Sequence, residues 1–158
     1  MKIKNPKLLI FSIGISQLAG IIGSVFTTSE IDNWYVFLNK PSFNPPNWIF
    51  GPVWIILYTL MGISLYLVWL KGYKEENIKR AVNFFLIHLA VNSLWSIVFF
   101  GLHDLRLALV IIFTLWLMIL YLIKLFLNIN KIAAYLLIPY LLWVSFASLL
   151  NYSIWILN

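Results

Sequence analysis

Three hydrophobic segments of this chain carry aromatic and polar side chains at helical spacing, and these residues could hold a ligand. Residues three, four and seven positions apart lie on one face of an α-helix. Three such faces are Trp54, Tyr58, Met61 and Leu65; Asn92, Trp95, Ser96 and Phe99; and Trp143, Phe146, Ala147 and Leu150. If these faces meet, they enclose a flat slot with aromatic walls, which suits a planar, mostly apolar molecule. The alternative interpretation is ordinary packing between membrane helices, which the same faces would also serve.

Two polar residues lie deep in these hydrophobic segments. Asn92 carries an amide that needs partners when buried, so it marks either a pocket or a hydrogen bond between helices. His88 is ionisable, and three roles remain open: a neutral, hydrogen-bonded structural residue, an axial ligand of haem, or a proton-linked gate. His103 lies at the end of its segment, beside Asp104 and Arg106, where a capping or interfacial role is expected.

The sequence lacks the motifs of metal-dependent and nucleophilic enzymes. It has no serine–histidine–acid set, no HExxH, no P-loop and no GxGxxG. Because it has no cysteine, disulfides, thiolate metal sites and covalent haem attachment are excluded. The five acidic residues lie in connectors and near segment ends, so paired carboxylates inside a membrane are not expected. We therefore expect no metal site and no required cofactor, and any catalysis would depend on the ligand and on tryptophan side chains.

The composition is that of a membrane protein. Hydrophobic residues make up 63% of the 158 residues and charged residues only 10%, against about 25% charged in soluble domains. Spanning a bilayer takes about 20 apolar residues, and five segments are long enough. Their expected ranges are 7–27, 48–70, 78–101, 105–128 and 132–156. The predicted fold is an all-α integral membrane protein, a single domain over 1–158 with five transmembrane helices in a compact bundle and a structured first loop.

The basic residues predict how the protein is oriented. The N-terminus and the second and fourth connectors hold nine of the cations, which are Lys2, Lys4, Lys7, Lys71, Lys74, Lys79, Arg80, Lys124 and Lys131. The other side holds Lys40 and Arg106. In a plasma membrane this bias places the N-terminus inside and the first connector outside. The +6 net charge therefore reflects membrane orientation, and no nucleic-acid partner is expected.

The first connector, residues 34–54, is rich in proline and aromatic residues. Pro41, Pro45 and Pro46 cannot continue a helix, so residues 40–46 should form an ordered, non-helical segment. Such a segment suits a lid over an apolar cavity at the membrane surface. An interfacial belt of aromatic residues is the alternative interpretation.

Small residues and a proline predict the shape of two helices. Ser12, Ser16, Gly20 and Ser24 recur every four residues, so another helix can approach this face closely. The partner could be a helix of the same chain or a second copy in a homodimer. Pro139 lies inside the last segment and should kink it, either to turn the Trp143 face toward the pocket or merely to shape the helix.

The chain resembles the translocator protein family, which includes TspO and the tryptophan-rich sensory proteins. The first connector carries the family's pattern at Trp34, Tyr35, Leu38, Lys40, Pro41, Phe43, Pro45, Pro46, Trp48, Phe50, Gly51, Pro52, Trp54, Leu57 and Tyr58. Two further blocks, residues 90–103 and 133–151, are similar to the same family, so the resemblance covers nearly the whole chain.

The resemblance implies a ligand cavity and a class of ligand. Matching positions form the family's cavity at Trp54, Asn92, Trp95, Trp143 and Ala147, with Tyr35 in a lid beside it. The implied ligands are porphyrins, namely protoporphyrin IX and haem, in tetrapyrrole homeostasis or a stress response. Bacterial members are reported to degrade porphyrin oxidatively in light, which would give Trp54 and Trp143 catalytic roles.

This chain departs from the family's pattern in two places. The family usually carries a glutamine where this chain has His88. Its sterol motif is incomplete here, because no lysine or arginine follows Tyr152. The alternative function is a non-catalytic transporter or a lipid- or sterol-binding protein.

Overall fold

Three of the six α-helices in the described part of the chain begin at a side chain that caps the first turn. The computed structural model describes residues 4–158. The helices are α1 (Pro6–Asn33), α2 (Phe50–Trp69), α3 (Glu76–Ser96), α4 (Leu105–Leu127), α5 (Lys131–Tyr135) and α6 (Ile138–Leu157). Asn5, Asp104 and Asn130 accept hydrogen bonds from backbone N–H groups in the first turns of α1, α4 and α5. These caps satisfy donors that a helix start would otherwise leave unpaired.

The five predicted spans are confirmed. Helical stretches long and apolar enough to cross a membrane are Pro6–Asn33, Asn47–Trp69, Glu76–Gly101, Leu105–Leu127 and Lys131–Leu157. The largest difference is at the end of α1, which continues six residues beyond the predicted Thr27. The predicted span ended at residue 27, but Thr27 and Thr28 donate their hydroxyls to carbonyls one turn earlier and the helix continues.

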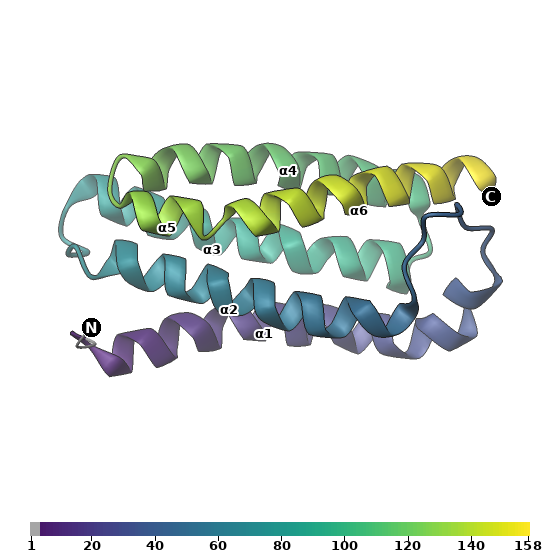
Figure 1. Ribbon diagram of the computed structural model, residues 1–158, viewed down its shortest axis with the longest axis horizontal. Helices are drawn as coiled ribbons and strands as arrows, with labels where there is room; N and C mark the ends of the chain where they lie inside the picture. The colour runs from purple at the N-terminus through teal and green to yellow at the C-terminus, as the bar shows by residue number, and fades with distance from the viewer. Residues whose placement is uncertain (1–3) are drawn as a thin grey trace.

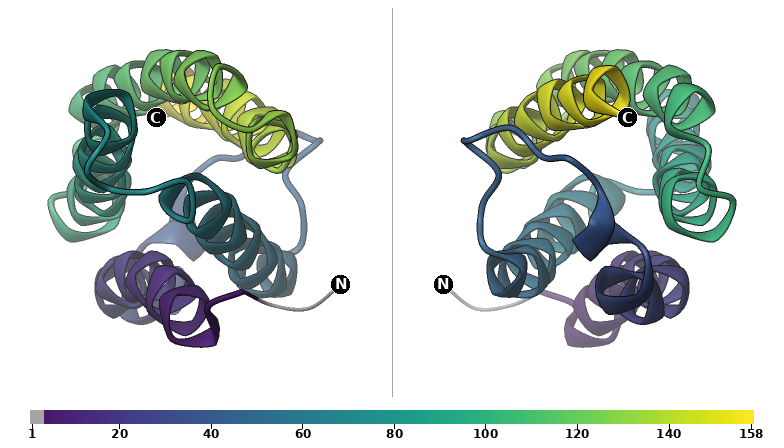
Figure 2. Two further views of the ribbon diagram at one scale, coloured as in Figure 1. Left: turned by 90° about the vertical axis from the view of Figure 1, so that its left-hand side faces the viewer. Right: turned by 90° about the vertical axis from the view of Figure 1, so that its right-hand side faces the viewer.

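The helices form a ring in which the last span closes against the second. Around the ring, α1 contacts α2 and α3, α3 contacts α4, and α4 contacts α5 and α6 (Figure 2). α5 returns to α2, whereas α6 touches α2 only slightly. The connector between α1 and α2 lies at the opposite end of the bundle from the N-terminus, next to the C-terminus (Figure 1).

The last span is divided where a kink was predicted. α5 ends at Tyr135, residues 136 and 137 form a turn, and α6 begins at Ile138 with Pro139 in its first turn. Proline lacks an N–H and its ring clashes with the carbonyl four residues earlier, which here belongs to Tyr135. The helix therefore stops and restarts, a stronger break than the predicted kink.

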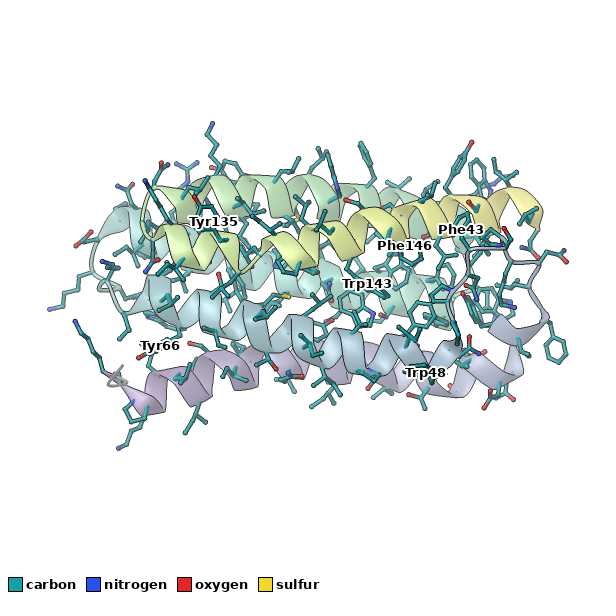
Figure 3. The ribbon with its side chains drawn as sticks, in the orientation of Figure 1. Phe43, Trp48, Tyr66, Tyr135, Trp143 and Phe146 are labelled. Atoms are coloured by element: carbon teal, nitrogen blue, oxygen red, sulfur yellow. The ribbon has the colours of Figure 1, made fainter. Side chains whose placement is uncertain are left out.

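The lid, which we define as residues 34–49, is ordered as its prolines predict. Two short 3-10 helices, η1 (Tyr35–Phe37) and η2 (Asn47–Ile49), flank a non-helical stretch. Phe43 packs edge-on against Phe146 of α6, with ring centroids 6.3 Å apart. Trp48 lies at the surface, as an interfacial aromatic residue would (Figure 3). Within this one segment, Phe43 packs inward as the lid interpretation expects, and Trp48 faces outward as the belt interpretation expects.

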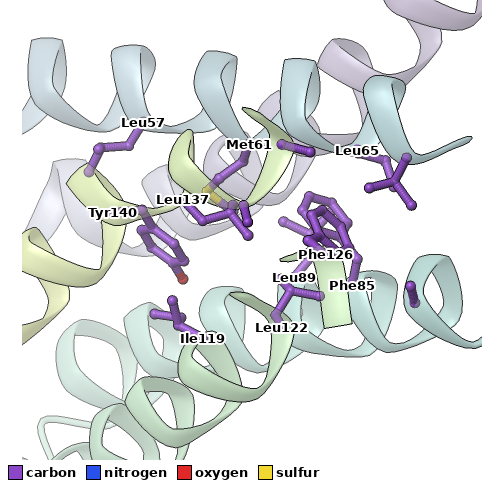
Figure 4. Packing of buried hydrophobic residues seen from close by; sticks show 14 of the residues in the cluster. Leu57, Met61, Leu65, Phe85, Leu89, Ile119, Leu122, Phe126, Leu137 and Tyr140 are labelled. Atoms are coloured by element: carbon purple, nitrogen blue, oxygen red, sulfur yellow. The ribbon is translucent and has the colours of Figure 1, made fainter. Parts of the chain in front are cut away.

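The half of the bundle away from the lid is densely packed. Leu65 of α2, Phe85 of α3 and Phe126 of α4 are fully buried there, together with Leu137 just before α6 (Figure 4). The rings of Phe85 and Phe126 stack with centroids 6.2 Å apart. This dense core fixes the helices at one end and leaves room for a cavity at the other.

Part of the small-residue face of α1 packs inside the chain. Ser12, Ser16, Ala19 and Gly23 are buried. A Cβ at Gly62 of α2 would lie 2.5 Å from Ile13 Cα, so the two backbones are in close contact. Ser93 of α3 also donates to the Ala19 carbonyl at 2.9 Å. Of the predicted face, Ser12 and Ser16 thus pack inside the chain, Gly20 is half-buried and Ser24 is exposed.

Candidate functional site: an aromatic cavity under the lid

The lid half of the bundle contains a cavity of about 390 Å³. Its walls come from the later part of α1, the start of α2, the end of α3 with the following η3 (Ile97–Gly101), and α6, and the lid contributes Tyr35 and Asn47. A volume of this size is within the usual range for small-molecule sites. In the described part of the chain, no Asp, Glu, Lys, Arg or His lines it. The cavity therefore offers aromatic and apolar surface with scattered hydroxyl and amide groups.

Eight of the ten predicted site residues line this cavity. They are Tyr35, Trp54, Tyr58, Trp95, Ser96, Phe99, Trp143 and Ala147. Residues from all three helical faces drawn from the sequence therefore meet around one cavity, whereas Met61 and Leu65 of the first face lie in the core. Asn92 and Phe146 do not line it.

Asn92 lies behind the cavity wall. Its side chain accepts a hydrogen bond from the Tyr58 hydroxyl and donates one at 2.8 Å to the oxygen of Tyr140. It therefore joins α2, α3 and α6, which is the interhelical alternative left open by the sequence. Tyr140, which the sequence analysis missed, is the centre of this cluster because it also contacts Nε2 of His88 at 2.9 Å.

His88 is fully buried and does not line the cavity. Its Nε2 is already engaged by Tyr140, so that nitrogen is not available to a molecule in the cavity. Of the three roles left open, the structural one fits this geometry.

Phe146 supports the lid side of the cavity wall. It lies between Phe43 of the lid and Trp143, with centroids 6.3 and 5.5 Å away (Figure 3). Trp143 and Ala147, one helical turn apart, face the cavity together with Leu150. Phe146 directly precedes Ala147, so its side chain points in a different direction around the helix, toward the lid.

The indoles of the cavity are fixed in different ways. Trp54 stacks on Tyr58, with ring centroids 5.4 Å apart. Trp95 donates its ring N–H to Asn151 at 3.1 Å. The ring N–H of Trp143 is buried and has no hydrogen-bond partner in the described residues. An unpaired buried donor is costly, and because this nitrogen has almost no accessible surface, a ligand acceptor could reach it only if the Trp143 side chain rotates.

Tyr35 connects the lid to the cavity. It is 4% exposed and donates its hydroxyl to Asn44 of the lid at 2.7 Å. The ammonium of Lys40 lies 4.9 Å from the centre of its ring and donates to the carbonyls of Val36 and Leu38. Burial raises the pKa of the Tyr35 phenol to about 12, so the lid carries a neutral phenol at ordinary pH.

Besides the contact of Phe43 with Phe146, hydrogen bonds to the end of α6 and a ring stack attach the lid to the rest of the bundle. Asn39 and Asn158, at the end of α6, exchange hydrogen bonds: the Asn39 N–H donates to Asn158 Oδ1, and Asn158 Nδ2 donates to the Asn39 carbonyl, both at 3.0 Å. At the start of the lid, Trp34 stacks on His103 with centroids 4.1 Å apart. His103 in turn contacts Glu30 of α1 at 3.0 Å, so it links three segments at the end of the bundle.

The sequence analysis missed one whole wall. α1 lines the cavity with Gln17, Gly20, Ile21, Gly23, Ser24, Thr27, Thr28 and Ile31. The signal was present in the small residues Gly20 and Ser24, but it was interpreted only as a packing face. Phe100 was missed because η3 (Ile97–Gly101) is a π-helical turn, which adds a residue and brings it to the wall beside Phe99.

The cavity reaches the outer surface between α1 and α2. All of its exposed lining residues belong to α1, η2 and the start of α2, and they are Ile21, Ser24, Thr28, Asn47, Gly51 and Ile55. Below them, Gln17 donates to the Ile55 carbonyl at 3.0 Å and to Thr59 at 2.9 Å, which closes the seam.

Five spans enclosing a lidded, aromatic cavity define the class of the molecule: a multi-pass helical membrane protein with an internal cavity. The comparisons with known proteins agree. The model of the TspO/MBR family matches residues 12–156, and the chain belongs to this family. The predicted resemblance and the predicted integral membrane localisation are thereby confirmed.

The matches to curated relatives cover most of this chain and most of each relative. The tryptophan-rich protein TspO of Archaeoglobus fulgidus is 42% identical over 150 residues, which is 95% of this chain and 96% of the relative. Protein CrtK of Rhodobacter capsulatus is 37% identical over 89% of this chain and 86% of its own. The human translocator protein is 37% identical over 88% of this chain and 83% of its own.

Proposed function

We propose that the cavity binds porphyrins, such as protoporphyrin IX or haem, or planar apolar molecules of similar shape. The observation that carries the proposal is that three of the eight tryptophans, Trp54, Trp95 and Trp143, line one cavity together with Tyr and Phe rings. Aromatic walls favour a flat conjugated ligand by stacking and apolar burial. The porphyrin is the ligand itself, and the site needs no resident cofactor or metal.

Polar groups in the cavity would orient such a ligand. The unpaired ring N–H of Trp143 would donate to a ligand oxygen or nitrogen once its side chain rotates toward the cavity. Hydroxyl groups of Ser24, Thr27 and Thr28 lie along the α1 wall, toward the lid end. Their hydrogens are donated to backbone carbonyls, so they would accept hydrogen bonds from the polar edge of a porphyrin, while its apolar edge lies deeper, near Tyr58. In the cell, this binding would serve tetrapyrrole homeostasis or a stress response.

A titration tests the proposal. Protoporphyrin added to the protein in lipid nanodiscs should quench tryptophan fluorescence saturably, because three indoles lie at the proposed site. Empty nanodiscs and nanodiscs with an unrelated membrane protein measure quenching by pigment dissolved in lipid. If the quenching rises linearly and equally in all samples, the pigment only partitions into the membrane. If cholesterol binds saturably and protoporphyrin does not, the alternative of a sterol- or lipid-binding protein without catalysis replaces the proposal.

A second proposed activity is light-dependent oxidation of the bound pigment. It is favoured by the easily oxidised indoles of Trp54 and Trp143 at the cavity wall. Trp54→Phe and Trp143→Phe should slow pigment conversion under matched light and oxygen more than they weaken binding, since Phe keeps the apolar ring. Equal bleaching rates and products in the parent and both variants would leave a protein that binds or transports the pigment without catalysis.

A further inference from the structure

A continuous chain of hydrogen bonds lies directly behind the cavity wall. It runs from Tyr58 through Asn92 and Tyr140 to His88, which are 6%, 3%, 0% and 0% exposed. Tyr58 belongs to the wall, and the other three are enclosed by the dense core. Two phenols and an imidazole buried together in a membrane protein are costly unless each is satisfied.

Counting hydrogens gives the direction of the bonds at Asn92, and the tautomer of His88 sets the direction of the last bond. A phenol has one hydrogen to donate, and the Tyr58 hydroxyl donates it to Asn92 Oδ1. The Asn92 amide then donates from Nδ2 to the oxygen of Tyr140. In the tautomer in which Nε2 of His88 carries no hydrogen, Tyr140 donates its own hydrogen to that nitrogen at 2.9 Å, and the imidazole hydrogen lies on Nδ1, which has no partner in the described residues. The result is a buried phenol that donates to the basic nitrogen of an imidazole.

This pair is in aromatic contact with the cavity. Trp54 lines the cavity and lies edge-on to the ring of Tyr140, with centroids 6.2 Å apart. It also stacks on Tyr58 at 5.4 Å. Electrons exchange readily between aromatic rings at such contact distances. Trp54 is thus a cavity residue with two phenols within reach behind it.

Only one of the two phenols can lose a proton when it is oxidised. An oxidised phenol is strongly acidic, so its oxidation is easy only where a base accepts the proton. Tyr58 donates to an amide oxygen, which is a very weak base, whereas Tyr140 donates to an imidazole nitrogen. The geometry therefore distinguishes Tyr140 from Tyr58 as an electron donor.

We propose that Tyr140 and His88 form a proton-coupled electron donor that re-reduces Trp54 after its oxidation in the cavity. A one-electron oxidant, which would be a light-excited planar pigment, first takes an electron from the Trp54 indole. Tyr140 then gives one electron to the Trp54 radical cation, and its O–H bond breaks as the proton moves to His88 Nε2. The products are a neutral indole, a neutral Tyr140 radical and a His88 imidazolium. The inference rests on the proposed function only for the source of the oxidant.

The arrangement would protect the cavity. A radical left on Trp54 would react with ligand or oxygen in the cavity, and the indole would be destroyed. Moving the radical to the fully buried Tyr140 places it behind the wall, out of contact with the cavity. Asn92 acts as a positioning residue, because its amide holds the Tyr140 oxygen while the hydrogen stays directed at His88.

The test oxidises the indoles without any pigment, so a failure of porphyrin binding does not affect it. An ultraviolet flash ionises tryptophan side chains in protein reconstituted in nanodiscs, and high-field electron paramagnetic resonance identifies the radical that remains. The parent should form a tyrosyl radical. That signal should be lost in Tyr140→Phe and in Trp54→Phe, and it should fall in His88→Gln. Tyr66→Phe is the matched control, since Tyr66 is a buried tyrosine outside this chain and should leave the signal unchanged (Figure 3).

Isotope exchange provides a second measurement on the parent alone. After equilibration in D2O, the tyrosyl radical should form more slowly, because the proton moves with the electron. This measurement decides the proposal even if a variant fails to fold. The proposal is overturned if the parent forms no tyrosyl radical, if Tyr140→Phe retains the full signal, or if the rate is the same in H2O and D2O.

Discussion

Gly20 of α1 lies directly against the ring of Tyr58 of α2. A Cβ at position 20 would come within 2.4 Å of Tyr58 Cε2 and 2.7 Å of Cδ2. The ring cannot easily move aside, because Trp54 stacks on one face of it and Asn92 holds its hydroxyl. The absence of a side chain at Gly20 therefore lets the Tyr58 ring occupy its position in the cavity wall.

Gly20→Ala should destabilise the protein and displace Tyr58. Overpacking of this kind typically costs about 1–3 kcal/mol. The control is Gly14→Ala on the same helix, where an added Cβ meets nothing within 4 Å. There the better helix propensity of alanine should stabilise by up to about 1 kcal/mol. Thermal unfolding in detergent measures both, and equal effects would contradict the contact.

Breaking the hydrogen bonds between Asn39 of the lid and Asn158 of α6 should speed ligand release. Asn158→Ala removes the side chain that both accepts from and donates to the Asn39 backbone. The lid should then open more often, so the dissociation rate and cleavage of residues 38–46 by protease should both rise. Ser42→Ala, an exposed change within the lid, is the control. An unchanged dissociation rate in Asn158→Ala would mean that the ligand leaves by another route. The candidate route is the opening between α1 and α2.

The lid should loosen at high pH through Tyr35. Its pKa is about 12 in the folded protein against an ordinary value of 10.0, because burial disfavours the phenolate. A raised pKa means that the folded state holds this proton more tightly. The stability it contributes is complete below pH 10 and is lost as the pH rises toward 12. Ultraviolet difference titration of the parent against Tyr35→Phe isolates this group, and a Tyr35 transition near pH 10 would contradict its burial.

The orientation of the protein can be tested by labelling, because the chain has no cysteine. Ser42→Cys lies in the lid, and Tyr73→Cys lies in the connector at the opposite end. The excess of lysine and arginine at the N-terminal end predicts that this end stays inside. A membrane-impermeant maleimide added to intact cells should label position 42 and spare position 73. The reverse pattern would contradict the assignment.

Long apolar runs made the spans predictable, and helical spacing made the three aromatic faces predictable. Spacing assigns a residue to a face, however, and not to a depth behind that face. Asn92 has the same spacing as the wall residues, but hydrogen bonds to Tyr58 and Tyr140 hold it behind the wall. Tyr140 itself could not be found from spacing on its own helix, since its role depends on partners from α2 and α3.

The α1 wall and the divided last span show two further limits. Gly20 and Ser24 have little side chain, so their pattern describes close approach of helices without indicating that a cavity lies beside it. Pro139 predicted a local distortion, but the size of that distortion depends on which hydrogen bonds the neighbours replace. Here Leu137 donates to Ala134 in a tight turn, and the helix restarts.

The most direct test of the account is porphyrin affinity in a pair of alanine variants. Ala147 lies one turn after Trp143 and lines the cavity, whereas Ala90 is exposed on α3. A leucine at position 147 would fill space at the cavity wall, at a cost of about 1–3 kcal/mol, or roughly a tenfold to hundredfold weaker Kd. Fluorescence titration with protoporphyrin in nanodiscs should show this loss for Ala147→Leu and none for Ala90→Leu. Binding by Ala147→Leu as tight as by the parent would contradict the claim that the ligand occupies this cavity.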